Sequence, residues 1–357
     1  MRKLFRHWPW VVPLVAWFLL ALHSAVNVPT AAIAFILAAS VISAVHHAEI
    51  IALKLGEPFG TLMLALAVTV IEVGLILSLM SGTGSDTAAL ARDTVIAAVM
   101  IILNGLVGIC LLIGGIRHRE QTFQQSGVSA ALATLSALTV LSLVLPNFTV
   151  SEPGPVYSPA QLAFVAVVSL LLYGTFITVQ TVRHREYFLS PRMADEGFDT
   201  EIVRPTSKQS TISFAVLLAA LGAVVLLAKI LSEPLEIMID SVGAPRATLG
   251  VIIAALVLLP ESVAATRAAL ANRIQTSLNL ALGSALATIG LTIPAVAALS
   301  LISDLPLALG LSGKSTVLLA LTLLVATLSL ANGRTTILQG MVHLVIFGVY
   351  IFTTVVP

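Results

Sequence analysis

The sequence predicts an all-α polytopic membrane protein of about eleven transmembrane helices, built as an extra first helix followed by two inverted five-helix repeats. Its 357 residues are 58% hydrophobic and only 10% charged, and their mean hydropathy is +1.05. A soluble domain typically carries about 25% charged residues. The formal net charge of +1 offers no excess positive charge to a polyanion, so nucleic acid is not an expected partner. The apolar segments and the placement of the basic residues define the fold further.

Eleven apolar segments are long enough to cross the roughly 30 Å of hydrocarbon in a bilayer. They lie near residues 9–26, 28–53, 58–81, 93–115, 127–145, 159–182, 212–231, 246–268, 275–302, 312–331 and 334–356.

The first segment is predicted to be a membrane helix within residues 1–27. Three basic residues, Arg2, Lys3 and Arg6, precede it and small residues surround Ala25, a pattern that a secretory signal peptide would also show. Because ten further apolar segments follow, an uncleaved helix is the preferred interpretation.

The basic residues predict the orientation of the chain in the membrane. If the N-terminus is cytoplasmic, 14 of the 18 Lys and Arg residues lie in cytoplasmic segments, and only Arg92, Lys229, Arg246 and Lys314 lie outside. The opposite orientation would reverse this ratio. The positive-inside rule therefore predicts a cytoplasmic N-terminus and an extracytoplasmic C-terminus.

One long polar segment, residues 184–211, divides the chain after the sixth helix. It is predicted to be a solvated cytoplasmic linker rather than a regulatory cation site, because basic residues are interspersed among its acidic ones. Five helices remain on each side, in residues 28–183 and 212–357, and an odd number forces the two repeats into opposite orientations. The acidic residues of the linker are Glu186, Asp195, Glu196, Asp199 and Glu201.

Two carboxylates, Glu72 and Glu261, lie deep inside apolar segments, in AVTVIEVGLILSLM and LGVIIAALVLLPESVAA. An ionisable residue at bilayer depth is costly and marks an ion or proton pathway by default. Counted from Pro58 and Arg246, the two residues lie about 21 and 22 Å along their helices. Both are expected in the middle third of the membrane, related by a pseudo-two-fold axis in its plane, a known plan for secondary transporters.

The neighbours of these carboxylates could add oxygen ligands. Thr69 precedes Glu72 by three residues, so its hydroxyl shares a helical face with the carboxylate. Pro260 and Ser262 flank Glu261. A proline removes one N–H donor and displaces the carbonyl four residues earlier, which frees backbone oxygens beside the carboxylate.

Such oxygens suit a hard cation, since Ca²⁺ takes about 6 to 8 oxygen ligands in a loose geometry. Burial and the like charge of a second carboxylate also favour protonation, so a cation and protons are expected to compete for Glu72 and Glu261. These two residues are the predicted metal and proton ligands. The alternative is that each is neutral and hydrogen-bonded to a neighbouring helix for structural reasons.

Further candidates lie in other segments. Asn104, Asn279 and Ser284, in the segments that follow those of the glutamates, could add neutral oxygens. At the predicted cytoplasmic end of the second segment, His46, His47 and Glu49 could form a proton relay or a cation access point, or could be interfacial residues that end a helix.

Two residues are predicted to be structural. His343 is expected to be a hydrogen-bonded core histidine. Cys110 is the single cysteine, so neither an intrachain disulfide nor a thiolate metal site can form from it, and it is expected to be a small core residue.

The segment HHAEIIALKLGEPFGTLMLALAVTVIEVGLI resembles the bacterial ChaA-type Ca²⁺/H⁺ antiporters of the Ca²⁺:cation antiporter superfamily. The resemblance continues in LLPESVAATRAALANRIQTSLNLALGSALATIGLTIP and NGRTTILQGMVHLVIFGVYIF. It implies proton-driven export of Ca²⁺, or of Na⁺ or K⁺ in some members, with Glu72 and Glu261 matching the paired glutamates of the family. Thr69 and Leu258 stand where the wider cation/H⁺ exchanger group has Asn three residues before each glutamate.

These observations predict an alternating-access cation/proton antiporter of the bacterial inner membrane. Its partners are the lipid bilayer, protons and an inorganic cation that is cargo, and no cofactor is expected. An ion channel is the first alternative, disfavoured because the carboxylates are two singletons rather than a ring. An intramembrane enzyme is the second, disfavoured because HExxH, GxSxG and paired intramembrane aspartates are absent from the sequence.

Overall fold

The computed structural model describes residues 8–23, 28–56, 59–80, 87–189, 205–241, 243–303 and 306–356. Within these ranges the secondary structure is helical, and the only β-type pairing is an isolated bridge between Thr122 and Arg334. The predicted fold class, an all-α polytopic membrane protein, is confirmed.

Every apolar segment of the sequence coincides with a helix of the described residues. Among the described residues, eight helices are long and apolar enough to cross a membrane, and a bent pair, Ala247–Val257 with Leu259–Leu270, can form a ninth span. Two further apolar helices lie near the N-terminus, α1 (Trp8–His23) and α3 (Phe59–Met80). The count of eleven stays a prediction.

The helices form two compact units, and each unit takes elements from both halves of the sequence. The first unit comprises residues 1–87 and 201–260, and the second comprises residues 88–200 and 261–357. These units are defined by contacts in space, so they do not test the two predicted repeats, residues 28–183 and 212–357. The repeats stay a prediction.

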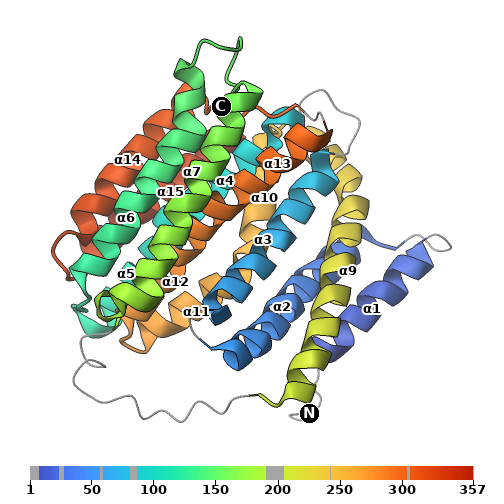
Figure 1. Ribbon diagram of the computed structural model, residues 1–357, viewed down its shortest axis with the longest axis horizontal. Coiled ribbons are helices and arrows are strands. Elements are labelled where there is room, and N and C mark those ends of the chain that lie inside the picture. Colours follow the sequence, from blue (N-terminus) through green and yellow to red (C-terminus); the bar gives the residue numbers. More distant parts are fainter. Residues whose placement is uncertain are drawn as a thin grey trace. The chain divides into compact units, whose positions relative to one another are not determined.

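In the first unit, α2 (Thr30–Leu55) packs on α9 (Ser207–Ser241), α3 and α1, while α10 (Ala247–Val257) contacts α2, α3 and α9. The buried residues recur every three or four positions on α2 and on α9, which is the spacing of one helical face. Many of them are alanines, which let two membrane helices approach closely. Figure 1 shows α2 in blue and α9 in yellow within this unit.

The helix α9 is longer than the apolar segment that predicted it. The expected span was residues 212–231, whereas α9 runs from Ser207 to Ser241 and contains Pro234. Hydropathy identifies the apolar part of a helix but not its ends, because Lys229, Glu233 and Glu236 interrupt the apolar run without ending the helix. The C-terminal part of the predicted linker, from Ser207 onward, is therefore helical. Its acidic residues 195–201 lie outside the described residues.

The second unit is a bundle in which α15 packs against α5, α12 against α6, and α13 against α7. Glycines allow the closest of these approaches: a Cβ at position 340 would lie 2.5 Å from Leu112 N, and one at position 108 would lie 3.1 Å from His343 Cβ. The elements are α4 (Leu90–Met100), η3 (Ile101–Leu106), α5 (Val107–His118), α6 (Gln125–Thr139), η4 (Val140–Val144), η5 (Leu145–Phe148), α7 (Pro159–Thr178), η6 (Val179–Arg183), η7 (Arg185–Phe188), α11 (Leu259–Leu270), α12 (Ile274–Ala287), η8 (Thr288–Thr292), α13 (Ile293–Ser303), α14 (Gly313–Leu330) and α15 (Ile337–Val355).

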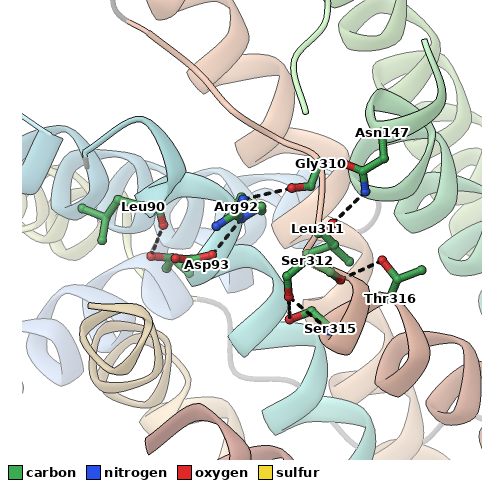
Figure 2. Close-up of polar contacts among 10 residues, drawn as sticks. Leu90, Arg92, Asp93, Asn147, Gly310, Leu311, Ser312, Ser315 and Thr316 are labelled. Carbon is green, nitrogen blue, oxygen red and sulfur yellow. Dashed lines mark hydrogen bonds and ion pairs between the residues drawn. The ribbon is translucent and has the colours of Figure 1, made fainter. Parts of the chain in front are cut away.

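An extended strap before α14 ties the predicted extracytoplasmic end of the second unit together (Figure 2). Arg92 Nη1 donates to Gly310 O at 2.9 Å while its Nε lies 2.8 Å from Asp93 Oδ1. Asn147 Nδ2 donates to Leu311 O at 2.7 Å. Arg92, one of the four basic residues predicted outside, thus neutralises Asp93 and satisfies a loop carbonyl, and its role is structural.

Candidate functional site

Glu72 lies on α3 in the first unit, and its side chain is only 3% exposed. Thr69, one turn earlier, is buried as well, as are Ile71 and Leu75 around them. The glycine that follows, Gly74, faces α9 so closely that a Cβ there would lie 2.6 Å from Val225 Cγ2. The predicted pairing of hydroxyl and carboxylate on one buried helical face is therefore present in α3. Burying a charged carboxylate costs several kcal/mol unless a proton or a cation neutralises it.

Glu261 lies on the first turn of α11, directly after a break in its span. The helix α10 ends at Val257 and α11 begins at Leu259, and the two are bent by 57°. Pro260 accounts for the break because it has no N–H for the carbonyl of Leu256 and its ring crowds that carbonyl, which can kink or end a helix. The predicted span 246–268 is thus two short helices rather than one. Glu261 occupies a helix N-terminus, where the helix dipole favours a negative charge.

Asn104 lies in the π-helical segment η3, in the middle of the span Leu90–His118. Its Nδ2 donates to Thr322 Oγ1 at 2.8 Å, and its Oδ1 lies 3.2 Å from His343 Nδ1. All three side chains are fully buried. His343 is therefore a hydrogen-bonded core histidine, as predicted. A role for Asn104 as a cation ligand stays a prediction, because its amide groups already join η3 to α14 and α15.

Asn279 lies on the second turn of α12, close to the predicted cytoplasmic surface. Its Oδ1 accepts from Gln275 Nε2 at 2.9 Å and its Nδ2 donates to Phe188 O at 2.6 Å. Phe188 also packs edge-on against Phe176, with 5.8 Å between ring centroids. Asn279 thus holds the first turn of the linker on α12. Its predicted role as a cation ligand is untested. Its hydrogen bond to Phe188 O attaches the linker to α12.

Ser262 and Ser284 are half-buried, on α11 and α12 respectively. The span that contains Ser284 has a π-helical segment, η8, near its middle, and π segments also occur in two other spans, at η4 and η6. The span that follows the Glu72 helix therefore contains the π segment η3, and the span that follows Glu261 contains the π segment η8. Such segments are rare and frequent at functional sites, because the extra residue loosens the backbone hydrogen-bond ladder. Sequence reasoning did not detect either of them.

The predicted relay residues divide into a buried and an accessible group. His47 is fully buried, and its Nε2 lies 3.2 Å from Pro9 O, which also accepts a 2.6 Å hydrogen bond from Ser43 Oγ. His46 is half-buried and Glu49 is exposed on the helix surface. Trp10 packs edge-on against His47, with 4.4 Å between ring centroids. His47 therefore fastens α1 to α2, and a relay through the three residues stays a prediction.

The carbonyl of Pro9 is free for this contact because Pro13 follows it by one helical turn. In an α-helix the carbonyl of residue i accepts from the N–H of residue i+4, and proline has no N–H. Ser43 and His47, four residues apart on one face of α2, replace that donor. The sequence shows the Pro9–Pro13 spacing. It does not show that Ser43 and His47 of α2 would contact the Pro9 carbonyl.

Cys110 is buried in α5, as expected for a small core residue. Its thiol contacts the side chains of Ser277 and Thr266 within the second unit. Within the described ranges, groups of three or more His, Cys, Asp or Glu side chains that could hold a metal ion are not found.

A multi-pass helical protein with single carboxylates inside two of its helical segments has the architecture of a membrane transporter. The chain belongs to the family described as sodium/calcium exchanger protein, whose model matches residues 26–182 and 212–356. The gap between the two matched stretches, residues 183–211, coincides with the predicted linker, residues 184–211, to within one residue. Family membership places the chain among cation transporters.

Two sequence relatives and one solved structure illustrate this membership. The chain is 46% identical to y4hA of Sinorhizobium fredii, whose name assigns it to ionic transport only provisionally, over 98% of this chain and 96% of the relative. It is 36% identical to the sodium-potassium/proton antiporter ChaA of Escherichia coli, over 88% and 85%. The structure of native YfkE superposes with a TM-score of 0.74 at 16% identity, covering 98% of this chain and 100% of that chain, which shows a shared fold.

Proposed function

We propose that this protein is a secondary active antiporter that exchanges an inorganic cation for protons, with Glu72 and Glu261 as the residues that bind both. The observation that carries the proposal is the burial of Glu72 beside Thr69 in the apolar helix α3. A carboxylate kept there without a function would weaken the fold, since an apolar residue of similar volume would be at least as stable. Glu261, at the broken helix, supplies the second carboxylate.

The exchange follows from competition for the same oxygens. Protons that reach the glutamates from outside release the cation outward, and loss of those protons toward the cytoplasm restores the cation site. The two fluxes are coupled because a cation and a proton cannot occupy one carboxylate together. In this account Thr69, Ser262, Ser284 and the backbone carbonyls before Pro260 supply neutral oxygens, which suit a hard cation.

The cargo is proposed to be Ca²⁺, with Na⁺ and K⁺ as the alternatives. Two carboxylates match the charge of a divalent ion. The name of ChaA, the relative at 36% identity, gives sodium and potassium instead. One glutamate with a monovalent cation and the other with a proton would satisfy the same charge balance.

We further propose the bacterial inner membrane as the location, with the N-terminus cytoplasmic and the C-terminus outside. The bacterial relatives support this location, and the ratio of basic residues supports this orientation. Glu49, which is exposed at the predicted cytoplasmic end of α2, could deliver protons or cations. Glu49→Gln should then slow exchange without abolishing it.

Exchange is tested in everted membrane vesicles with an acid interior. Adding Ca²⁺, Na⁺ or K⁺ separately should dissipate the pH gradient only for the transported ion, with saturation at high concentration. Raising that cation at fixed pH should also shift the pH of half-maximal exchange downward, because each ligand excludes the other. A pH optimum that does not move with cation concentration would mean separate sites. Cation flux that is neither saturable nor coupled to protons would favour a channel.

A further inference from the structure

The C-terminal end of α11, the short helix that carries Glu261, has an unusually complete cap. Asn272 has a φ of 60°, Arg273 N donates to Ala268 O at 2.9 Å, and Asn272 N donates to Ala269 O at 3.1 Å. These features define a Schellman motif with asparagine in the left-handed position. The motif ends the helix at one fixed residue.

Two side chains, one from the last residue of α5 and one from the segment after it, complete this cap. Gln121 Nε2 donates to Ala269 O and to Asn272 Oδ1, each at 3.0 Å. His118 Nε2 lies 3.0 Å from Leu270 O. Both hydrogens of the Gln121 amide are thus directed at one helix end, and the carbonyls that a helix end leaves without intrahelical donors are satisfied.

Gln121 is itself held in a single position. It is 2% exposed, its N–H donates to Thr335 Oγ1 at 3.2 Å, and its carbonyl accepts from Thr335 N at 3.0 Å. Its Oε1 lies against Gly114, where a Cβ would overlap it. The side chain is therefore preorganised for α11 before any ion binds.

Glu261 lies nine residues before Leu270, the last residue of α11. A helix rises about 1.5 Å per residue, so the cap and the carboxylate are roughly 13 Å apart along one rigid element. The break at Leu258 separates α11 from α10, so the C-terminal cap, together with the contact of Thr266 with Cys110, fixes the axial position and rotation of α11. Ligand groups must be held to within about half an ångström by such supporting contacts.

We propose that Gln121 is a positioning residue for Glu261, acting through α11. This inference rests on the proposed function, in which Glu261 binds the cation and the proton. Gln121 touches neither ion. Its two hydrogen bonds set where the carboxylate stands, and therefore the balance between cation and proton binding.

The test is Gln121→Met, which keeps the length of the side chain and removes both donors. The matched control is Gln339→Met, because Gln339 Nε2 donates to Ser329 O at 2.7 Å near the end of α14, a helix without an acidic residue. In everted vesicles Gln121→Met should raise the apparent KM for the cation about 5-fold, the effect of losing roughly one hydrogen bond, and should shift the pH of half-maximal exchange. Gln339→Met should leave both unchanged.

A second variant keeps the test usable if Gln121→Met folds poorly. Asn272→Gly retains the left-handed backbone conformation and removes only the Oδ1 acceptor, so its shift in KM and in the pH profile should be smaller and in the same direction. KM values and pH profiles in both variants that match Gln339→Met would overturn the proposal and leave Gln121 a structural residue. Glu261→Gln is measured in the same vesicles: if it still exchanges protons for cations, the proposed function fails, whatever Gln121 does.

Discussion

Asn104 and His343, 239 residues apart in the sequence, meet inside the second unit with 3.2 Å between Oδ1 and Nδ1. Because the asparagine oxygen can only accept, His343 donates from Nδ1, which fixes its tautomer. Asn104 Nδ2 in turn donates to Thr322 Oγ1, so one amide connects three helical elements at the π segment of its span.

Asn104→Leu should therefore lower the free energy of unfolding by about 2 to 4 kcal/mol, because it leaves two buried polar groups unsatisfied. Thermal unfolding of the detergent-solubilised protein measures the loss. Thr175→Val is the control, since Thr175 Oγ1 bonds only within its own helix, to Leu171 O at 2.7 Å on an exposed face. Equal effects of the two substitutions would contradict a network that holds the helices together.

The contact between α1 and α2 predicts that a third substitution should restore part of the stability that two other substitutions remove. Ser43→Ala combined with His47→Phe removes both donors to Pro9 O and should destabilise the protein by about 1 to 3 kcal/mol. Adding Pro13→Ala restores the N–H that an α-helix supplies at this position, so stability should partly return. The fluorescence of Trp10, which contacts His47, reports the docking. A triple variant no more stable than the double variant would refute the explanation.

The sequence predicted the helices well, because apolar runs are local features, whereas the roles of Glu72 and Glu261 stay predictions. Pairings such as Asn104 with His343 depend on which helices become neighbours, and no local pattern encodes that choice. The same limit applies to Asn279: its type and segment suggested a cation ligand, whereas both of its amide groups are used by Gln275 and Phe188. The sequence does indicate the break at Leu258, because Pro260 disrupts the helix only at the residues close to it.

Tyr157 gives a prediction about pH. Its hydroxyl donates to Leu141 O at 2.5 Å in the connection before α7, and burial raises the pKa of Tyr157 to about 12. A raised pKa in the folded state means that its contribution to stability is complete below about pH 10 and is lost as the pH rises toward 12. Tyr157→Phe should thus be about 1 kcal/mol less stable than the wild type at neutral pH, and the difference should shrink above pH 10. A difference that is constant across this interval would contradict the assignment.

The orientation of the chain is testable with two reporters. With 14 of the 18 basic residues assigned to the cytoplasmic side, a reporter fused after Pro357 should be extracytoplasmic. One inserted between Ala194 and Thr200, which lie outside the described residues, should be cytoplasmic. Alkaline phosphatase and fluorescent-protein fusions distinguish the two sides. Finding both reporters on the same side would exclude an odd number of helices between them, and the inverted repeat with it.

Glu72→Gln and Glu261→Gln, measured in everted vesicles, test whether Glu72 and Glu261 bind the exchanged ions. Glutamine keeps the size and hydrogen bonding of glutamate but carries neither the charge that a cation needs nor an exchangeable proton near neutral pH. Each variant should insert at near-normal levels and lose cation/proton exchange, while Glu152→Gln, on an exposed loop, should exchange normally. Full exchange by either intramembrane variant would contradict the account and leave that glutamate a structural residue.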